Sequence, residues 1–395
     1  MTSDTLSGDT HVTSTGTETK PTASGGLRGT VLPRIEWEGP TPRVKPSERV
    51  RFEELGLLGE GGMGEVVLAV DHDIQREVAL KRLPENCDLG RVLRFVEEIR
   101  TVGQLEHPNI VPVHDVGIDA TGRYYFVMKH LRGETLESII GRLKAGDQAA
   151  CARFTLPVRT QILLSVLSAL AHAHQQGFIH RDLKPANIMV GPYGEVTVMD
   201  WGLAKRLRGP EAPMTEPAQS RERTVLETQL GAVLGTPFYM SPEQARGEHD
   251  TLDERSDLYA AAVVFHELLH LDHYLAGKTE LRAVLDGVQR DTPTLHRSSF
   301  APPDRQVPAD LDWFLARGLA KDRAARFQST REMVDELQRI IRGECRVQCH
   351  RTFMKRVFSA QQRALDRYPI PVMVGAAVTV GVVLMAAALL LNTLW

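Results

Sequence analysis

Hydrophobic residues follow two successive patterns along the chain, with the change near Gly133. Before it, short β-branched or aromatic runs bounded by Gly, Asp or Pro predict strands at 52–58, 65–70, 77–83, 111–116 and 124–129. Among these runs, residues 89–105 instead show apolar residues at helical spacing. After Gly133 the helical pattern predominates, at 158–176, 257–269, 280–286, 309–319 and 330–342. A sheet-rich part followed by a helix-rich part predicts two lobes of one α+β unit.

The N-terminal segment has a different composition. Its first 30 residues contain nine Thr and four Ser with few large apolar side chains, too little apolar surface to offset the entropy of ordering. We therefore expect residues 1–48 to be disordered, with the disorder running to about Pro46. No apolar run of the kind found in a secretory signal is present there.

The C-terminal residues are the most apolar of the chain. Residues 370–391 carry no charge, and as a helix they would span roughly 33 Å, enough for a bilayer core. A buried core helix is the alternative. The preceding segment, 345–369, is basic, and such residues stay on the cytoplasmic side of a membrane. We expect a single-pass membrane helix, a folded domain on the cytoplasmic face and a short non-cytoplasmic tail, 392–395.

Overall composition changes this picture little. The chain has 395 residues, 42% hydrophobic, with 47 Lys and Arg against 50 Asp and Glu and a net charge of −3. This balance gives no electrostatic reason to expect nucleic acid as a partner. Four cysteines in this length argue against a disulfide framework and for a reducing compartment.

Candidate chemistry begins with the G-x-G-x-x-G pattern of Gly59, Gly61 and Gly64. Alone it fits a dinucleotide-binding turn, a phosphate-covering flap or an ordinary hairpin. A dinucleotide fold requires a helix directly after the last glycine. Here residues 66–70 have a strand pattern instead, so the glycines are predicted to lie in a hairpin between strands. Glycine lets backbone N–H groups approach phosphate oxygens closely.

Three further motifs follow in a fixed order. Val-Ala-Leu-Lys ends at Lys81, and the next predicted helix carries Glu98, a natural ion-pair partner for that lysine, with Glu97 as a neighbour. His-Arg-Asp-x-Lys-x-x-Asn follows the long apolar helix, and Asp-Trp-Gly lies eighteen residues past its aspartate. Any one of these could be ordinary surface or turn chemistry, but the joint order is far less common by chance.

In these motifs the sequence resembles the protein kinases, most closely the bacterial eukaryote-like Ser/Thr kinases. The resemblance covers about residues 52–342 and extends to the segments 107–111, 235–243, 256–259 and 321–326. It implies a two-lobed kinase fold over 49–344, with a β-rich N-lobe to about residue 130 and a helical C-lobe from about 131. ATP and Mg²⁺, with Mn²⁺ as a possible replacement, are the implied cofactors.

The resemblance also implies site residues. Asp182 would be the catalytic base, Lys184 would neutralise the γ-phosphate, and Lys81 with Glu98 would orient the phosphates. Asn187 and Asp200 would bind Mg²⁺. The implied nucleotide-binding positions are Leu58, Gly59, Gly61, Gly64, Val66, Ala79, Lys81, Met128, Lys129, Leu131 and Met189.

Other implied features are structural. His180, Trp201, Val102 and Val113 would form an apolar column between the lobes, anchored by Asp257, and Glu243 would pair with Arg326. The chain departs from the family in having Trp201 where Phe is usual, Ser241 for Ala, Lys129 for an acidic residue and Ala262 for Gly. None of these changes removes a group that phosphoryl transfer needs.

Regulation is predicted from the same resemblance. Arg181 before the catalytic aspartate accompanies activation by loop phosphorylation in the family, and distance to Gly235 favours Thr228, then Thr224, as the phosphosite. Cys345 and Cys349 could bind metal or lipid, although ordinary reduced thiols are favoured because no fourth ligand lies nearby. Small residues within 375–381 could pack two spans into a homodimer.

The sequence thus predicts a membrane-anchored Ser/Thr protein kinase acting on protein hydroxyls. The alternative from another class is a catalytically silent, nucleotide-binding scaffold at the membrane. A small-molecule kinase of similar fold is disfavoured by the segment 235–243, which resembles a platform for peptide substrates.

Overall fold

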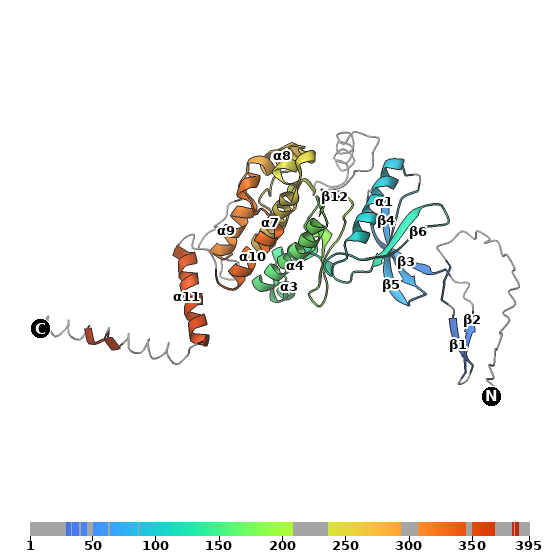
Figure 1. Cartoon of the computed structure of the whole chain (residues 1–395), viewed down its shortest axis with the longest axis horizontal. Coiled ribbons are helices and arrows are strands. Elements are labelled where there is room, and N and C mark those ends of the chain that lie inside the picture. The colour runs from blue at the N-terminus through green and yellow to red at the C-terminus, as the bar shows by residue number, and fades with distance from the viewer. Residues whose placement is uncertain are drawn as a thin grey trace, which may run out of the picture.

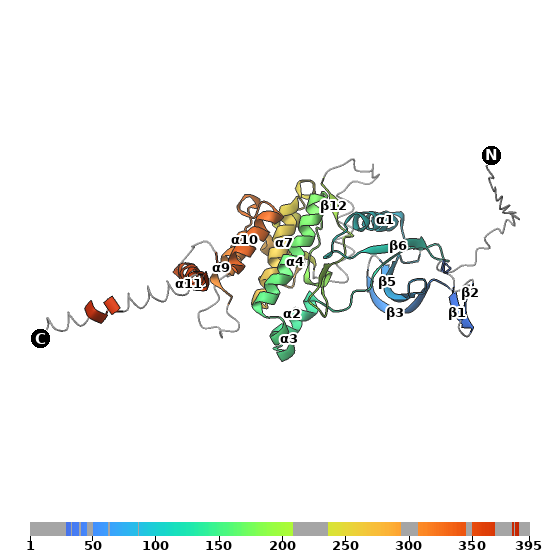
Figure 2. The same ribbon diagram turned by 60° about the horizontal axis from the view of Figure 1, so that its bottom comes forward.

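A computed structural model of the chain describes residues 29–32, 34–38, 41–45, 50–61, 64–85, 87–207, 236–293, 307–344, 350–367, 381–382 and 384–386. Two lobes lie side by side, a smaller one built on a sheet and a larger one built of helices (Figure 1, Figure 2). The chain passes from the first lobe to the second after residue 129, close to the boundary predicted from the sequence.

The N-lobe is a five-stranded antiparallel sheet in the order β3-β4-β5-β7-β6. Its strands are β3 (Phe52–Gly61), β4 (Gly64–Asp71), β5 (Arg76–Arg82), β6 (Val113–Ile118) and β7 (Tyr124–Lys129). Helix α1 (Leu89–Gln104) is capped by the Asp88 side chain, which accepts from the Arg91 N–H. Phe95 of α1 packs on Phe126 of β7, with ring centroids 5.3 Å apart, and so fixes the helix on one face of the sheet.

The C-lobe surrounds one buried helix. α7 (Glu254–His270) has buried residues on every side, which is typical of a helix at the centre of a large core. α4 (Leu156–Gln175) packs beside it in the same hydrophobic cluster. The other helices are α2 (Leu136–Lys144), α3 (Gln148–Arg153), α6 (Pro242–Ala245), α8 (Leu281–Arg290), α9 (Ala309–Gly318), α10 (Thr330–Ile341) and α11 (His350–Arg367).

Short strands and 3₁₀ turns connect the helices of the C-lobe. One sheet has the order β11-β10-β8, and β12 pairs with β9. Their bounds are β8 (Glu134–Thr135), β9 (Phe178–Ile179), β10 (Ile188–Val190), β11 (Val196–Val198) and β12 (Lys205–Arg206). The 3₁₀ turns are η1 (Pro185–Asn187), η2 (Thr236–Tyr239), η3 (His249–Thr251) and η5 (Arg323–Ala325).

All five predicted strands and the six helices predicted between residues 89 and 342 are confirmed, with bounds shifted by a few residues. Helices α2, α3, α6 and α11 were missed. α2 carries a readable signal, because its buried residues Leu136, Ile139, Ile140 and Leu143 have helical spacing and Thr135 caps it. α3 has only six residues, too few for periodicity to show.

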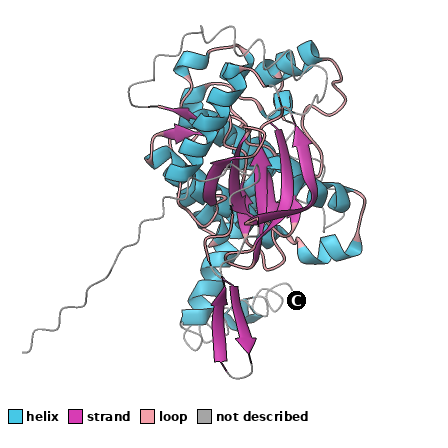
Figure 3. Ribbon diagram, turned by 90° about the vertical axis from the view of Figure 1, so that its right-hand side faces the viewer, coloured by secondary structure: helices cyan, strands magenta, loops and turns pink. Residues whose placement is uncertain are grey.

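The predicted disorder to Pro46 is wrong for part of that segment. β1 (Arg34–Glu38) and β2 (Thr41–Lys45) pair as an antiparallel hairpin that projects from the N-lobe (Figure 1, Figure 3). Just before it, the backbone N–H groups of Val31 and Leu32 donate to the Asp73 carboxylate at 3.1 Å. Composition missed the hairpin because its alternation of Ile35, Trp37 and Val44 with polar residues is a local pattern inside a polar segment.

The predicted membrane span, 370–391, lies almost entirely outside the described residues. Within it, residues 381–382 and 384–386 are helical, and the side chains of Val382, Leu384 and Met385 are exposed. Among the described residues, one helix is long and apolar enough to cross a membrane, α4. That helix packs within the C-lobe core.

Candidate active site

The glycine pattern lies in the tight hairpin between β3 and β4, where Gly61 faces Gly64. Gly64 is required by the fold itself, because its φ is 128° and a Cβ there would collide with the carbonyl of Arg82. At Gly59 and Gly61 an added Cβ would meet no protein atom within 4 Å. No contact among the described residues explains these two glycines, and bare backbone at both leaves room for close approach of a phosphate group.

A buried ion pair connects the sheet to α1. Lys81 Nζ of β5 lies 2.6 Å from Glu98 Oε1 and 4.0 Å from Asp200 Oδ1, and the Lys81 and Glu98 side chains are almost fully buried. Burial alone would lower the pKa of Lys81, but the negative charges of Glu98 and Asp200 outweigh it and raise that pKa. The lysine therefore stays charged, with its ammonium directed toward Asp200.

The loop between β9 and η1 presents the candidate catalytic residues. Asp182 is 8% exposed, and its Oδ2 accepts from Lys184 Nζ at 2.8 Å. Asn187 Nδ2 donates to the Asp182 backbone carbonyl at 2.9 Å, which fixes the loop from within. Burial raises the pKa of Asp182, while the neighbouring Lys184 ammonium opposes that rise. A carboxylate with a raised pKa is better suited to accept a proton.

The peptide before Asp182 is held from two sides. Arg181 has a left-handed backbone, with φ of 70°, and its N–H donates to Asp257 Oδ1 at 2.9 Å. The other Asp257 oxygen accepts from the His180 N–H and from His174, both at 2.8 Å. On the carbonyl side, Gln244 Nε2 of α6 donates to Arg181 O at 2.8 Å. A strained conformation persists only where its surroundings fix it, as here.

Asp200 follows β11, beside the loop that carries Asn187. The Met199 N–H donates to Asn187 O at 2.8 Å, so the two candidate metal ligands lie on adjacent backbone segments. Asp200 has φ of 58° and a side chain that is 45% exposed. Carboxylate and carboxamide oxygens suit Mg²⁺. Among the described residues, no group of three or more His, Cys, Asp or Glu could hold a metal ion.

Trp201 occupies the predicted apolar column. It is 1% exposed, its ring centroid lies 4.5 Å from that of His180, and it shares a core cluster with Val102, against which Val113 packs. The larger side chain therefore fits where the resemblance implies Phe. Its indole Nε1 finds no hydrogen-bond partner among the described residues.

The predicted nucleotide-binding positions lie on both lobes and on the connection between them. Ala79 of β5 faces Met128 of β7, and Val66 faces Lys81 across the sheet. Leu131 packs on the C-lobe core from the connection between the lobes, and Met189 lies on β10. Leu58 of β3 and Lys129 at the end of β7 are exposed. The structure therefore places these positions on the glycine hairpin, on β5 and β7, on the connection after β7 and on β10.

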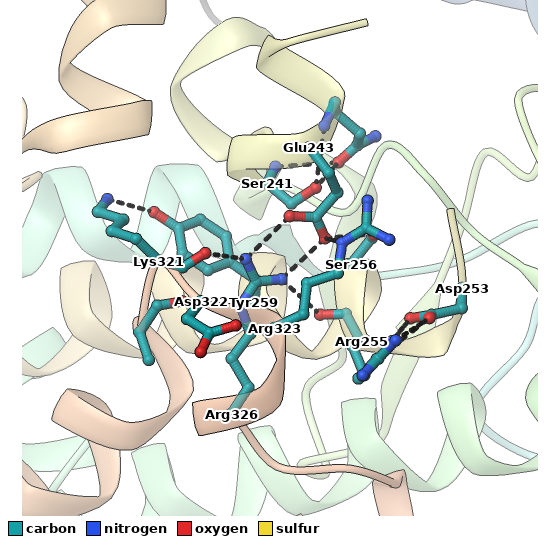
Figure 4. A network of polar contacts seen from close by, with 12 residues as sticks. Ser241, Glu243, Asp253, Arg255, Ser256, Tyr259, Lys321, Asp322, Arg323 and Arg326 are labelled. Carbon is teal, nitrogen blue, oxygen red and sulfur yellow. Dashed lines mark hydrogen bonds and ion pairs between the residues drawn. The ribbon is translucent and has the colours of Figure 1, made fainter. Parts of the chain in front are cut away.

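A second buried ion pair lies in the C-lobe (Figure 4). Glu243 accepts from both terminal nitrogens of Arg326 at 2.8 Å and from Ser256 Oγ at 2.8 Å, and neither charged side chain is exposed. Burial would raise the pKa of Glu243, but the Arg326 hydrogen bonds prevail and lower it to about 2. The pair joins α6 to the segment after α9 and so fixes the region that follows η2.

Sequence reasoning missed two residues of this site. Gln244 completes a capping box with Ser241, whose N–H and Oγ both donate to Gln244 Oε1 at 3.0 Å. The motif Ser-Pro-Glu-Gln is readable in the sequence, but the contact with Arg181 is not, because 63 residues separate the partners. No local pattern in the sequence indicated that His174 contacts Asp257. Thr224, Thr228, Cys345 and Cys349 lie outside the described residues.

Comparison with known proteins agrees with this geometry. The family model of the protein kinase domain matches residues 52–337. Serine/threonine-protein kinase PknD of Protochlamydia amoebophila is 33% identical over 306 residues, which are 74% of this chain and 30% of that protein. Probable serine/threonine-protein kinases of Bifidobacterium longum (PknB) and Streptomyces coelicolor (SCO3848) are 36% and 34% identical over 74% of this chain and 40% of their own length.

The fold and the site define a protein kinase domain, and the chain belongs to the protein kinase family. The chain spans less than half the length of these relatives.

Proposed function

We propose that the chain is an ATP- and Mg²⁺-dependent protein-serine/threonine kinase that transfers the γ-phosphate of ATP to hydroxyls of protein substrates. The observation that carries the proposal is the set of contacts that Lys81, Asp182 and Asp200 make. The Lys81–Glu98 pair is formed, Asp200 lies 4.0 Å from the lysine, and Asp182 is buried beside Lys184. Phosphoryl transfer asks a protein mainly for such positioning and charge neutralisation.

Each residue has a distinct task in this proposal. Lys81, oriented by Glu98, binds the α- and β-phosphates under the glycine hairpin. Asp182 orients the substrate hydroxyl and accepts its proton, while Lys184 neutralises charge on the γ-phosphate. Asn187 and Asp200 hold the metal ion, which when bound neutralises phosphate charge. The apolar side chains of Ala79, Met128, Leu131 and Met189 would border adenine, with the backbone of residues 129–131 bonding its edge.

The competing proposal is a nucleotide-binding scaffold without catalysis. A transfer assay with a generic basic protein as acceptor separates the two, with Asp182→Asn as the matched inactive variant. Transfer by wild type, absent from the variant, supports the kinase. No transfer by wild type, even after prior phosphorylation by another kinase, supports the scaffold. Phosphoamino-acid analysis of the product tests Ser/Thr selectivity, and phosphotyrosine as the main product would contradict it.

We also propose activation by autophosphorylation in trans. Arg181 adjoins the catalytic aspartate and would pair with a phosphate on Thr228, or on Thr224 as the second candidate. A protein that has never been phosphorylated, made by co-expression with a phosphatase, should gain activity with ATP over time. The Thr228→Ala variant should fail to gain it. Equal activation of variant and wild type would reject Thr228.

We further propose that the chain is anchored in a membrane. The uncharged segment 370–391 would cross the cytoplasmic membrane once, with the kinase domain on the cytoplasmic side and small residues of the span available for a homodimer. Exposed Val382, Leu384 and Met385 on helical backbone support a lipid-facing segment. Extraction of membranes at alkaline pH tests it, since a spanning helix stays with the lipid and a peripheral protein is released.

A further inference from the structure

Helix α11 lies on the C-lobe at the end of the molecule opposite the N-lobe (Figure 1, Figure 2). One side of α11 is fixed to α9. Thr352 is 1% exposed, and Lys355 Nζ lies 2.5 Å from Asp310 Oδ2, whose side chain is 2% exposed. Because a buried carboxylate without a partner is strongly unfavourable, this pair holds the helix in one rotation on the lobe.

The other side of α11 presents large apolar side chains to solvent. Phe353, Met354, Val357 and Phe358 are 52%, 48%, 44% and 61% exposed. With 3.6 residues per turn, these four positions share one face, turned away from Thr352 and Lys355. Such a concentration of exposed apolar residues marks an interaction site.

Charge indicates what covers this face. The sequence segment that contains the helix, 345–369, carries six Lys and Arg residues against one Asp. A basic helix with one apolar face is typical of a helix that lies in the surface of a bilayer with acidic lipids.

Chain length gives an independent reason. α11 ends at Arg367, and the uncharged segment begins at Ile370. Three residues reach at most about 10 Å, so a membrane-inserted segment brings the end of α11 to the bilayer surface. The helix then lies close to lipid, and lipid is available to cover its apolar face.

We propose that the exposed face of α11 lies in the headgroup region of an acidic bilayer, and that the Lys355–Asp310 pair fixes the base of the C-lobe to the membrane through it. This inference rests on the proposed membrane anchoring and on no property of the active site. It sets the orientation of the kinase domain, with the N-lobe at the end away from the bilayer.

The test uses the full chain in nanodiscs of phosphatidylcholine and phosphatidylglycerol. A photoreactive phenylalanine analogue replaces Phe358, Tyr124 or Leu384 in separate proteins, and adducts are identified by mass spectrometry after illumination. Tyr124 is an exposed aromatic residue on β7 of the N-lobe, and Leu384 reports on the span itself. We expect lipid adducts at 358 and 384 and none at 124. Pure phosphatidylcholine should lower the yield at 358 several-fold and leave 384 unchanged.

Lipid adducts at 384 but not at 358 would overturn the inference while leaving the anchoring intact. Adducts of position 358 with protein, from a second copy or from another segment of the chain, would also overturn it and name the true occupant. Absence of lipid adducts at both positions would reject the anchoring and the inference together. Kinase activity plays no part in these readouts, so its loss or retention does not affect them.

Discussion

Gln244 donates a hydrogen bond of 2.8 Å from its side-chain amide to the backbone carbonyl of Arg181. Arg181 precedes Asp182 and has φ of 70°, and Asp257 already fixes its N–H. The peptide that aims the candidate base is therefore held by α7 on one side and by α6 on the other. α6 begins within the segment 235–243, which resembles a platform for peptide substrates. The contact therefore joins that segment to the loop that carries Asp182.

The first prediction concerns that contact. Gln244→Glu keeps the size of the side chain but replaces the donating amide with a carboxylate that repels the Arg181 carbonyl. We expect kcat to fall about tenfold, equivalent to about 1.4 kcal/mol, with KM for ATP unchanged. Steady-state kinetics at varied ATP measure the split. Gln289→Glu is the matched control, because Gln289 donates to Leu285 O at 3.2 Å in α8. Equal kinetics of the two variants would exclude a positioning role for Gln244.

The second prediction concerns the Lys81–Glu98 pair. Glu98→Gln preserves the shape of the side chain but removes the charge that orients the ammonium, so we expect kcat/KM for ATP to fall about 100-fold. Lys144→Gln is the control, because it breaks the exposed Lys144–Asp272 pair at 3.3 Å, away from the proposed phosphate site. The role assigned to Glu98 fails if its variant keeps wild-type kcat/KM.

The third prediction concerns stability against pH. Arg326 lowers the pKa of Glu243 to about 2 from an ordinary 4.5, so the folded state favours the carboxylate. Its contribution is fully present above pH 4.5 and is lost as the pH falls toward 2. Glu243→Gln should cost about 3 kcal/mol of unfolding free energy at neutral pH and progressively less in acid.

Denaturant unfolding at several pH values measures this difference. Asp286→Asn is the control, because both partners of the Arg290–Asp286 pair are exposed and the change should leave stability nearly unchanged. A difference between Glu243→Gln and wild type that stays constant from neutral pH into acid would contradict the assignment.

The sequence allowed the scaffold of the site to be predicted because its signals are local. The glycine hairpin, Lys81 at a strand end and Asp200 after a strand each follow from a few neighbouring residues and from order along the chain. Contacts between distant segments could not be predicted unless the resemblance supplied them, as it did for Glu243 and Arg326. The resemblance did not supply the Gln244–Arg181 and His174–Asp257 contacts, and no local pattern could, because the partners are 63 and 83 residues apart along the chain.

The signal for α11 was local but was not recognised. Its apolar spacing was present in the sequence, but the high density of basic residues in 345–369 concealed it, and only the fold shows which face α9 covers. The hairpin of β1 and β2 was hidden in the same way, by the polar composition around it.

The central claim is that Asp182 acts on the hydroxyl that receives the phosphate, and one paired measurement tests it directly. Nucleotide affinity by calorimetry and the single-turnover rate of transfer to a protein acceptor are determined on the same preparations of wild type and Asp182→Asn. We predict equal ATP affinity within about threefold and a transfer rate lowered by about 10³-fold in the variant. Wild type that binds ATP but transfers no phosphate, or a variant that transfers at the wild-type rate, would contradict the claim.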